Sequence, residues 1–121
     1  MTEIRTAKST ILIAEDDAEV RKFVTTILQE HGFHVIAAAD ARQALTRARS
    51  FEADIHMLLT DVEMGKLDGF DLRERLLQER PHVKVVVMSG RLGEDFEPQD
   101  FPVLRKPFSK TQLIELIESQ L

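Results

Sequence analysis

The chain contains no cysteine among its 121 residues. That absence excludes a disulfide scaffold, a cysteine nucleophile and any zinc or iron–sulfur site with thiolate ligands. No apolar run approaches the roughly 18 residues that a membrane-spanning helix needs. Residues 1–10 also lack the apolar core of a secretion signal, so we expect a cytoplasmic chain that makes no membrane contact. Neither G-x-G-x-x-G nor G-x₄-G-K-[ST] occurs, which excludes the usual glycine-rich nucleotide-binding loops.

Basic residues are in the minority: 16 Lys and Arg stand against 21 Asp and Glu, for a formal charge of −5. We therefore expect no nucleic-acid partner for this domain. The four histidines lack the H-x₃-H or H-E-x-x-H spacing of a zinc site. With 43% hydrophobic and 31% charged residues, the composition is typical of a globular protein. The length suits one domain, which we place at residues 10–121 after an N-terminal extension at residues 1–9.

Short apolar runs alternate along the chain with stretches of helical periodicity. The apolar runs predict strands at 10–14, 34–38, 55–60, 83–88 and 101–105. The helical spacing predicts helices at about 17–31, 40–49, 70–79 and 109–121. Asp17 and Asp40 are predicted N-caps, and Ser109 with Gln112 matches a capping box. This order predicts a doubly wound α/β fold, with a parallel sheet covered by helices on both faces.

The polar residues that interrupt this pattern follow the predicted strands. They are Glu15, Asp16, Asp17, Asp61, Ser89 and Lys106. Taken singly, each has an ordinary explanation, such as an acid at a helix start or a polar turn residue. Taken together they converge, because the carboxyl ends of parallel strands share the sheet edge at which such folds bind ligands.

This set of side chains predicts a definite chemistry. Clustered carboxylates without His or Cys favour a hard cation, and Mg²⁺ suits a few carboxylates completed by water and phosphate oxygens. One carboxylate can then act as a nucleophile towards phosphorus. Lys106 and the cation would neutralise the phosphoryl oxygens, and Ser89 would donate a hydrogen bond to one of them. The predicted product is an acyl phosphate on an aspartate.

Four stretches in these positions resemble the receiver domain of two-component response regulators. They are ILIAEDD (11–17), DVEM with a following DG (61–64 and 68–69), MSG (88–90) and LRKPF (104–108). Each stretch alone has low specificity, whereas all four in order at strand ends are strongly specific together. The resemblance spans essentially the whole chain and implies a flavodoxin-like, five-stranded sheet with strand order 2-1-3-4-5. It implies a phosphoacceptor of a bacterial phosphorelay, and not an enzyme in the usual sense.

The resemblance also implies a role for individual residues. Asp61 accepts the phosphoryl group from a sensor histidine kinase or a histidine phosphotransfer protein. The implied ligands of Mg²⁺ (or Mn²⁺) are Asp16, Asp61, Glu15 through water and Glu63 through its backbone carbonyl. Ser89 and Lys106 match the hydroxyl and the lysine that contact the phosphoryl group in switching. The Lys106–Pro107 bond is a candidate cis peptide that positions this lysine.

The choice of the acidic pair among three adjacent acids depends on Arg21. This residue resembles an arginine that family members carry five residues after the second acid. That spacing makes Glu15 and Asp16 the pair and leaves Asp17 as an extra acid at the helix start.

The chain departs from the family pattern between Ser89 and Lys106. Only 17 positions separate these two residues, several fewer than usual in the family. The segment contains helix-breaking residues, namely Gly90, Gly93, Pro98 and Pro102. We therefore expect a shortened or missing fourth helix and an altered surface for the unknown downstream partner.

Other departures affect switching and dephosphorylation. Val103 stands where family members carry an aromatic ring that rotates on activation, and Phe96 or Phe101 is an alternative source of a ring. Gly65 replaces a proline, which predicts a looser loop. Glu63 and Arg91 lie two residues past Asp61 and Ser89, so they are candidates for hindering attack by water on the phosphoryl group.

Several questions of function stay open at this point. The first reading is a signalling switch, in which the chain is a phosphoacceptor. The chain is a single-domain regulator or a receiver excised from a hybrid kinase, and a homodimer contact at the edge of the last helix is an alternative to a monomer. A degenerate receiver that binds partners constitutively is a second reading. An aspartate-nucleophile phosphatase of the haloacid-dehalogenase type is a third, although its D-x-D-x-[TV] motif would need different residues in place of Glu63 and Gly65.

Overall fold

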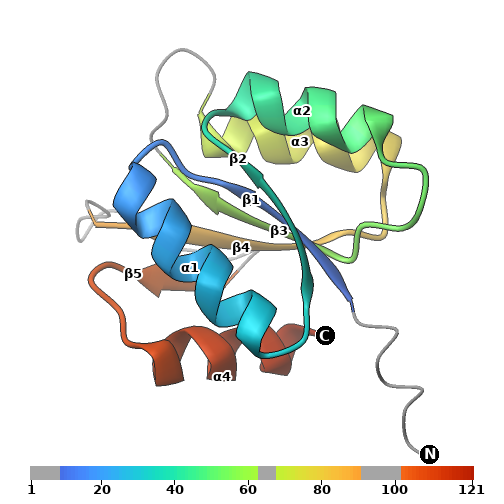
Figure 1. Cartoon of the computed structure of the whole chain (residues 1–121). Helices are drawn as coiled ribbons and strands as arrows, with labels where there is room; N and C mark the ends of the chain where they lie inside the picture. Colours follow the sequence, from blue (N-terminus) through green and yellow to red (C-terminus); the bar gives the residue numbers. More distant parts are fainter. Residues whose placement is uncertain (1–8, 63–67, 91–101) are drawn as a thin grey trace, which may run out of the picture.

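The computed structural model describes residues 9–62, 68–90 and 102–121. Over these residues the chain forms one parallel sheet with helices on both sides (Figure 1). The strands are β1 (Thr10–Ala14), β2 (His34–Ala38), β3 (Met57–Asp61), β4 (Lys84–Ser89) and β5 (Val103–Arg105). The helices are α1 (Ala18–Glu30), α2 (Ala41–Ser50), α3 (Gly69–Glu79) and α4 (Lys110–Gln120).

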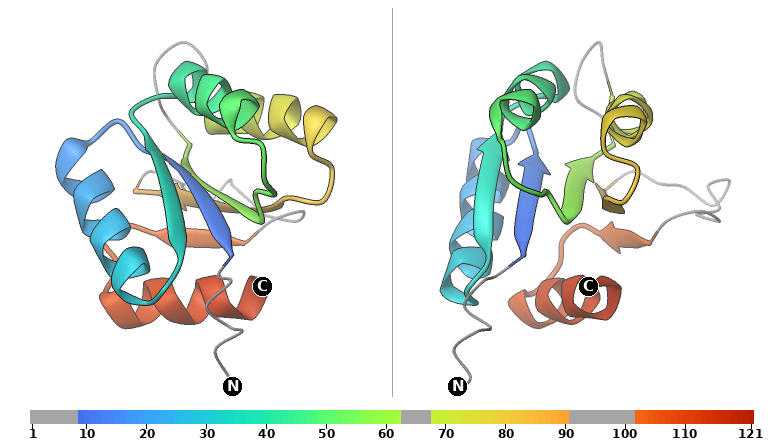
Figure 2. Two further views of the ribbon diagram at one scale, coloured as in Figure 1. Left: turned by 45° about the vertical axis from the view of Figure 1, so that its right-hand side comes forward. Right: turned by 90° about the vertical axis from the view of Figure 1, so that its right-hand side faces the viewer.

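The strand order is β2-β1-β3-β4-β5, and all four strand pairs are parallel, which confirms the predicted flavodoxin-like fold. Helices α2 and α3 cover one face of the sheet, while α1 and α4 cover the other (Figure 2). Because all strands run the same way, the residues that follow β1, β3, β4 and β5 meet at one edge.

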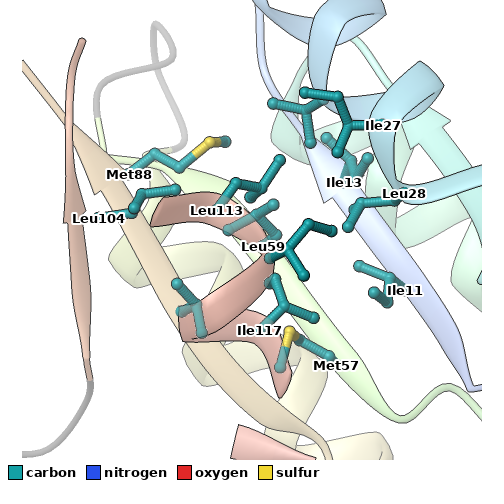
Figure 3. Packing of buried hydrophobic residues seen from close by; sticks show 13 residues of the cluster. Ile11, Ile13, Ile27, Leu28, Met57, Leu59, Met88, Leu104, Leu113 and Ile117 are labelled. Atoms are coloured by element: carbon teal, nitrogen blue, oxygen red, sulfur yellow. The ribbon is translucent and has the colours of Figure 1, made fainter. Parts of the chain in front are cut away.

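The buried strands explain the apolar runs of the sequence. Successive side chains of a strand point to opposite faces, so Ile11 and Ile13 pack towards α1 and α4, whereas Leu12 and Ala14 pack towards α2 and α3. All five residues of β1 are buried. Figure 3 shows the first of these two cores, in which β1 and β3 meet side chains from α1 and α4.

The helix ends confirm the capping residues that the sequence predicts. Asp17 Oδ1 accepts hydrogen bonds from the amides of Glu19 (2.9 Å) and Val20 (3.2 Å) at the start of α1. Asp40 caps α2 in the same way, through the amide of Gln43. At α4, both hydrogen bonds of the capping box are present. Each cap satisfies amides that would otherwise lack partners within the first helical turn.

Several strand boundaries differ from the predictions. The strand predicted at 83–88 is Lys84–Ser89, and the strand predicted to end at residue 60 ends at Asp61. The third strand begins at Met57 and not at residue 55. Ile55 is buried, so the apolar pattern correctly indicates burial at this position, although Ile55 is not part of the strand. The fifth strand is limited to Val103–Arg105. Residues 91–101, where a shortened or missing helix is expected, lie outside the described residues, and so do Phe96 and Phe101. None of the described helices is long and apolar enough to cross a bilayer.

Candidate functional site: a carboxylate cluster at the sheet edge

Three carboxylates converge where β1 and β3 end. Glu15 directly follows β1, and its amide donates to the carbonyl of Ala38 at 3.1 Å, which extends the ladder with β2 by one residue. Asp61 is the last residue of β3, the neighbour of β1 on its other side. One carboxylate oxygen each from Glu15, Asp16 and Asp61 lies within 4.8 Å of the others. The predicted acidic pair is therefore adjacent to the predicted phosphoacceptor.

The three carboxylates differ in their access to water. Glu15 is fully buried and Asp61 is 8% exposed, whereas Asp16 is on the surface. The cluster is therefore closed at its base and open at the side of Asp16. A cation or a phosphoryl group approaching from solvent meets Asp16 and Asp61, with Glu15 behind them.

A lysine lies between the two buried acids. Lys106 Nζ is 2.8 Å from Glu15 Oε1 and 3.3 Å from Asp61 Oδ1. Its backbone amide donates to the carbonyl of Ser89 at 2.9 Å, so β4 holds the residue from which this side chain extends. The Lys106–Pro107 peptide bond is cis, as predicted.

Burial and Lys106 shift the pKa values of the two buried carboxyl groups in opposite directions. Burial raises the pKa of Glu15 and of Asp61; contact with Lys106 lowers both values but does not restore them to normal. The charge of Asp16 adds to the rise for Asp61. For Lys106 burial works to lower the pKa, but its contacts with Glu15 and Asp61 outweigh burial and leave the pKa raised. Lys106 therefore keeps its positive charge, whereas the ionised forms of Glu15 and Asp61 are less favourable here than in water.

Ser89 and the start of α3 complete the surroundings of Asp61. Asp61 pairs with Met88 across the β3–β4 ladder, and Ser89 is the next residue, buried at the same edge. On the other side, the amide of Gly69 donates to the carbonyl of Val62 at 2.8 Å. A Cβ added to Gly69 would lie 2.2 Å from the carbonyl oxygen of Asp61, so α3 approaches this backbone more closely than a side chain permits.

Not every predicted site residue joins the cluster. The carboxylate of Asp17 caps α1 and is not one of the three that converge. Val103 is half-buried and pairs with Val87, on the sheet face opposite to Leu104. Glu63, Arg91 and Gly65 lie outside the described residues, so their predicted roles stay predictions.

Two features of the site were not predicted. The first is the close approach of Gly69 to the backbone of Asp61. The DG motif at residues 68–69 included this glycine but gave no reason for it. The sequence feature that could have indicated it is a glycine in the first turn of a helix, directly after an Asp cap. The second is Arg21, whose Nη1 donates to the carbonyl of Glu15 at 2.8 Å. The spacing singled out Arg21 but gave no contact for it.

The donor set of this cluster fits Mg²⁺. Its three groups are all carboxylates, with no imidazole or thiolate among them. Hard oxygen donors at a partly open edge leave room for water ligands, which Mg²⁺ retains in most protein sites. Glu15 Oε2 already accepts a hydrogen bond from the amide of Asp17, and Oε1 contacts Lys106, so Asp16 and Asp61 are the better placed to bind a cation directly.

Comparison with known proteins agrees with this geometry. The response regulator receiver domain matches the chain over residues 11–118. The response regulator receiver protein CpdR of Brucella abortus is 34% identical over 92% of this chain and 95% of its own length. The sensor kinase CckA of the same organism is 31% identical over 93% of this chain, which spans only 12% of that kinase. The chemotaxis protein CheY4 of Vibrio cholerae has the same fold, with a TM-score of 0.85 at 22% identity over 94% of this chain and 99% of its own.

Proposed function

The chain belongs to the response regulator receiver domain family, and from that premise we propose that Asp61 is its phosphoacceptor. Its donor would be the phosphohistidine of a sensor kinase or of a histidine phosphotransfer protein. The observation that carries the proposal is the convergence of Glu15, Asp16 and Asp61 around Lys106 at one sheet edge. The domain proper would be residues 10–121, after an extension at residues 1–9.

The reaction is a phosphoryl transfer between two side chains. A carboxylate oxygen of Asp61 forms a bond to phosphorus, while the bond from phosphorus to the donor imidazole nitrogen breaks and its electron pair stays on the imidazole. The product is an aspartyl phosphate. A bound Mg²⁺ supplies positive charge to the phosphoryl oxygens.

The residues around Asp61 have distinct tasks in this proposal. Asp16 and Asp61 would hold the cation directly, Glu15 would hold it through water, and Glu63 would contribute its backbone carbonyl. Lys106 is within ion-pairing distance of Asp61, so it can contact a phosphoryl oxygen attached there. Ser89, on the adjacent strand, donates a hydrogen bond to another oxygen.

The domain is not a classical enzyme, because the group that reacts is its own side chain and the product is the modified protein. We propose that it catalyses its own phosphorylation and the later hydrolysis of the acyl phosphate. Receiver domains interact with histidine kinases or phosphotransfer proteins, and this chain would then switch its binding of a downstream protein. Neither a constitutive binding module nor a phosphatase is needed to explain the retained acids, hydroxyl and lysine.

Intact-mass spectrometry after incubation with acetyl phosphate tests the acceptor. We expect one phosphoryl adduct on the wild type with Mg²⁺, none after chelation, and none on Asp61→Asn. The matched control is Asp54→Asn, which removes an exposed aspartate from the loop before β3 and should leave the adduct in place. Persistence of the adduct on Asp61→Asn, or its absence from the wild type with acetyl phosphate and also with a phosphorylated histidine kinase, would refute the assignment.

A further inference from the structure

The loop between β1 and α1 is held by hydrogen bonds on both sides of Asp16. The amide of Glu15 donates to Ala38 on β2, and the carbonyl of Glu15 accepts from Arg21 Nη1 at 2.8 Å. One peptide further on, the amide of Asp17 donates to Glu15 Oε2 at 3.0 Å. The two peptide groups that flank Asp16 are therefore each fixed by one hydrogen bond.

These bonds set the direction of the Asp16 side chain. Among the residues that the structure describes, no hydrogen bond or ion pair is made by the Asp16 carboxylate itself, and it is exposed to solvent. Its place within 4.8 Å of Glu15 and Asp61 thus depends on the backbone that carries it. Rotation of the peptide between Glu15 and Asp16 would turn this carboxylate away from the cluster.

Arg21 holds that peptide from a rigid element. It lies in α1, half-buried, one turn after the Asp17 cap. The helix is anchored to the sheet by side chains with little or no exposure, namely Val24, Ile27 and Leu28. The guanidinium therefore transmits the position of α1 to the carbonyl of Glu15, and through it to Asp16.

We propose that Arg21 is a positioning residue of the cation site, which orients Asp16 by holding the carbonyl of Glu15. The inference rests on the proposed function, because it concerns the site that would bind Mg²⁺. Arg21 touches neither the cation nor the phosphoryl group in this proposal. Its task is to keep two ligands, Asp16 and Asp61, at the separation that one cation can bridge.

The charge of Arg21 provides a way to separate positioning from electrostatics. Removal of a cationic side chain near three carboxylates strengthens the binding of a divalent cation by Coulomb attraction. Loss of positioning weakens it, since the loss of outer-shell partners of metal ligands costs about tenfold to 100-fold in affinity. The two effects have opposite signs, so the direction of the change identifies the one that dominates.

The test is calorimetric titration of Mg²⁺ into the whole chain, with Arg21→Met, Arg21→Lys and the matched control Lys22→Met. Lys22 is the next residue of α1, is exposed, and carries the same charge. We expect about tenfold weaker binding for Arg21→Met, unchanged or slightly tighter binding for Lys22→Met, and an intermediate value for Arg21→Lys, which keeps a donor and the charge. Urea unfolding without Mg²⁺ checks that Arg21→Met is folded under the conditions of the titration.

Binding by Arg21→Met as tight as by Lys22→Met, or tighter, would overturn the inference. If Arg21→Met does not fold, Arg21→Lys decides: wild-type affinity in that variant counts against positioning, and weakened affinity supports it. A wild type that binds no Mg²⁺ would contradict the proposed cation site itself, and the inference with it. A wild type that binds Mg²⁺ with no effect of Arg21 would contradict the inference alone.

Discussion

The close approach of α3 to Asp61 makes Gly69→Ala a sharp test of the site geometry. The added Cβ would lie 2.2 Å from the carbonyl oxygen of Asp61 and 3.1 Å from its carbonyl carbon. Both atoms belong to the backbone and cannot rotate away. To reach an ordinary contact, the start of α3 or the end of β3 has to move by about 1 Å.

Two opposing effects set the expected magnitude. Overpacking of this kind costs about 1–3 kcal/mol, whereas alanine is favoured over glycine within helices by up to about 1 kcal/mol. The second effect is reduced here, because Gly69 is the first residue of α3. We therefore expect Gly69→Ala to lower the free energy of unfolding by about 2 kcal/mol and the melting temperature by about 8 °C. The same shift moves Asp61 and weakens Mg²⁺ binding.

Gly90→Ala is the matched control, because it adds the same methyl group at the same edge of the sheet. There the new Cβ would lie 3.5 Å from the Cβ of Lys106, an ordinary van der Waals contact. We expect its stability to stay within about 0.5 kcal/mol of the wild type. The chain has no Trp or Tyr, so urea unfolding is followed by circular dichroism. Wild-type stability in Gly69→Ala would refute the reasoning, as would equal losses in the two variants.

Two more substitutions test the electrostatics of the site and the support of the sheet at its other end. Asp61→Asn should raise the free energy of unfolding without Mg²⁺ at neutral pH, because burial holds the pKa of Asp61 above normal and the neutral amide avoids that cost. Urea unfolding as a function of pH measures this change, and a variant less stable than the wild type would contradict the prediction. Arg80 donates hydrogen bonds to the carbonyls of Ala48, Phe51 and Ala53, far from the cluster. Arg80→Met should therefore lower the free energy of unfolding by about 2 kcal/mol and leave Mg²⁺ affinity unchanged. Urea unfolding and calorimetry measure the two quantities, and weakened Mg²⁺ binding would contradict the prediction.

The sequence predicted the helix caps and the convergence of the acids from local pattern, together with the rule that parallel strands end at one edge. The strand order had a different source, because it was implied by the resemblance to receiver domains. Asp17, for example, is a cap because an acid precedes the apolar periodicity of α1. Placement of Glu15 beside Asp61 required only that their strands be neighbours, which the topology ensures.

Other features depend on distances that no local pattern encodes. The 2.2 Å approach at Gly69 arises from how α3 packs on the end of β3. The reach of Arg21 to the carbonyl of Glu15 depends on the angle at which α1 leaves the loop. Val103 could be seen to lack a ring, but its pairing with Val87 on β4 is a long-range contact that the local sequence does not give.

The buried carboxylates of the cluster destabilise the folded chain when they are ionised, and a bound cation would reduce this effect. The pKa values of Glu15 and Asp61 lie above normal in the folded chain, so folding is less favourable once pH rises above the unfolded values, 4.5 and 3.8, and both groups ionise. Lys106 offsets part of this cost while its ammonium persists, and that contribution is lost as pH rises through its raised pKa. A divalent cation adds positive charge at the same place, and at ten times its dissociation constant it stabilises the fold by about 1.4 kcal/mol. The arrangement that destabilises the free domain is therefore the one that would bind the cation, so substitutions that remove this electrostatic cost should gain stability and lose Mg²⁺ affinity together.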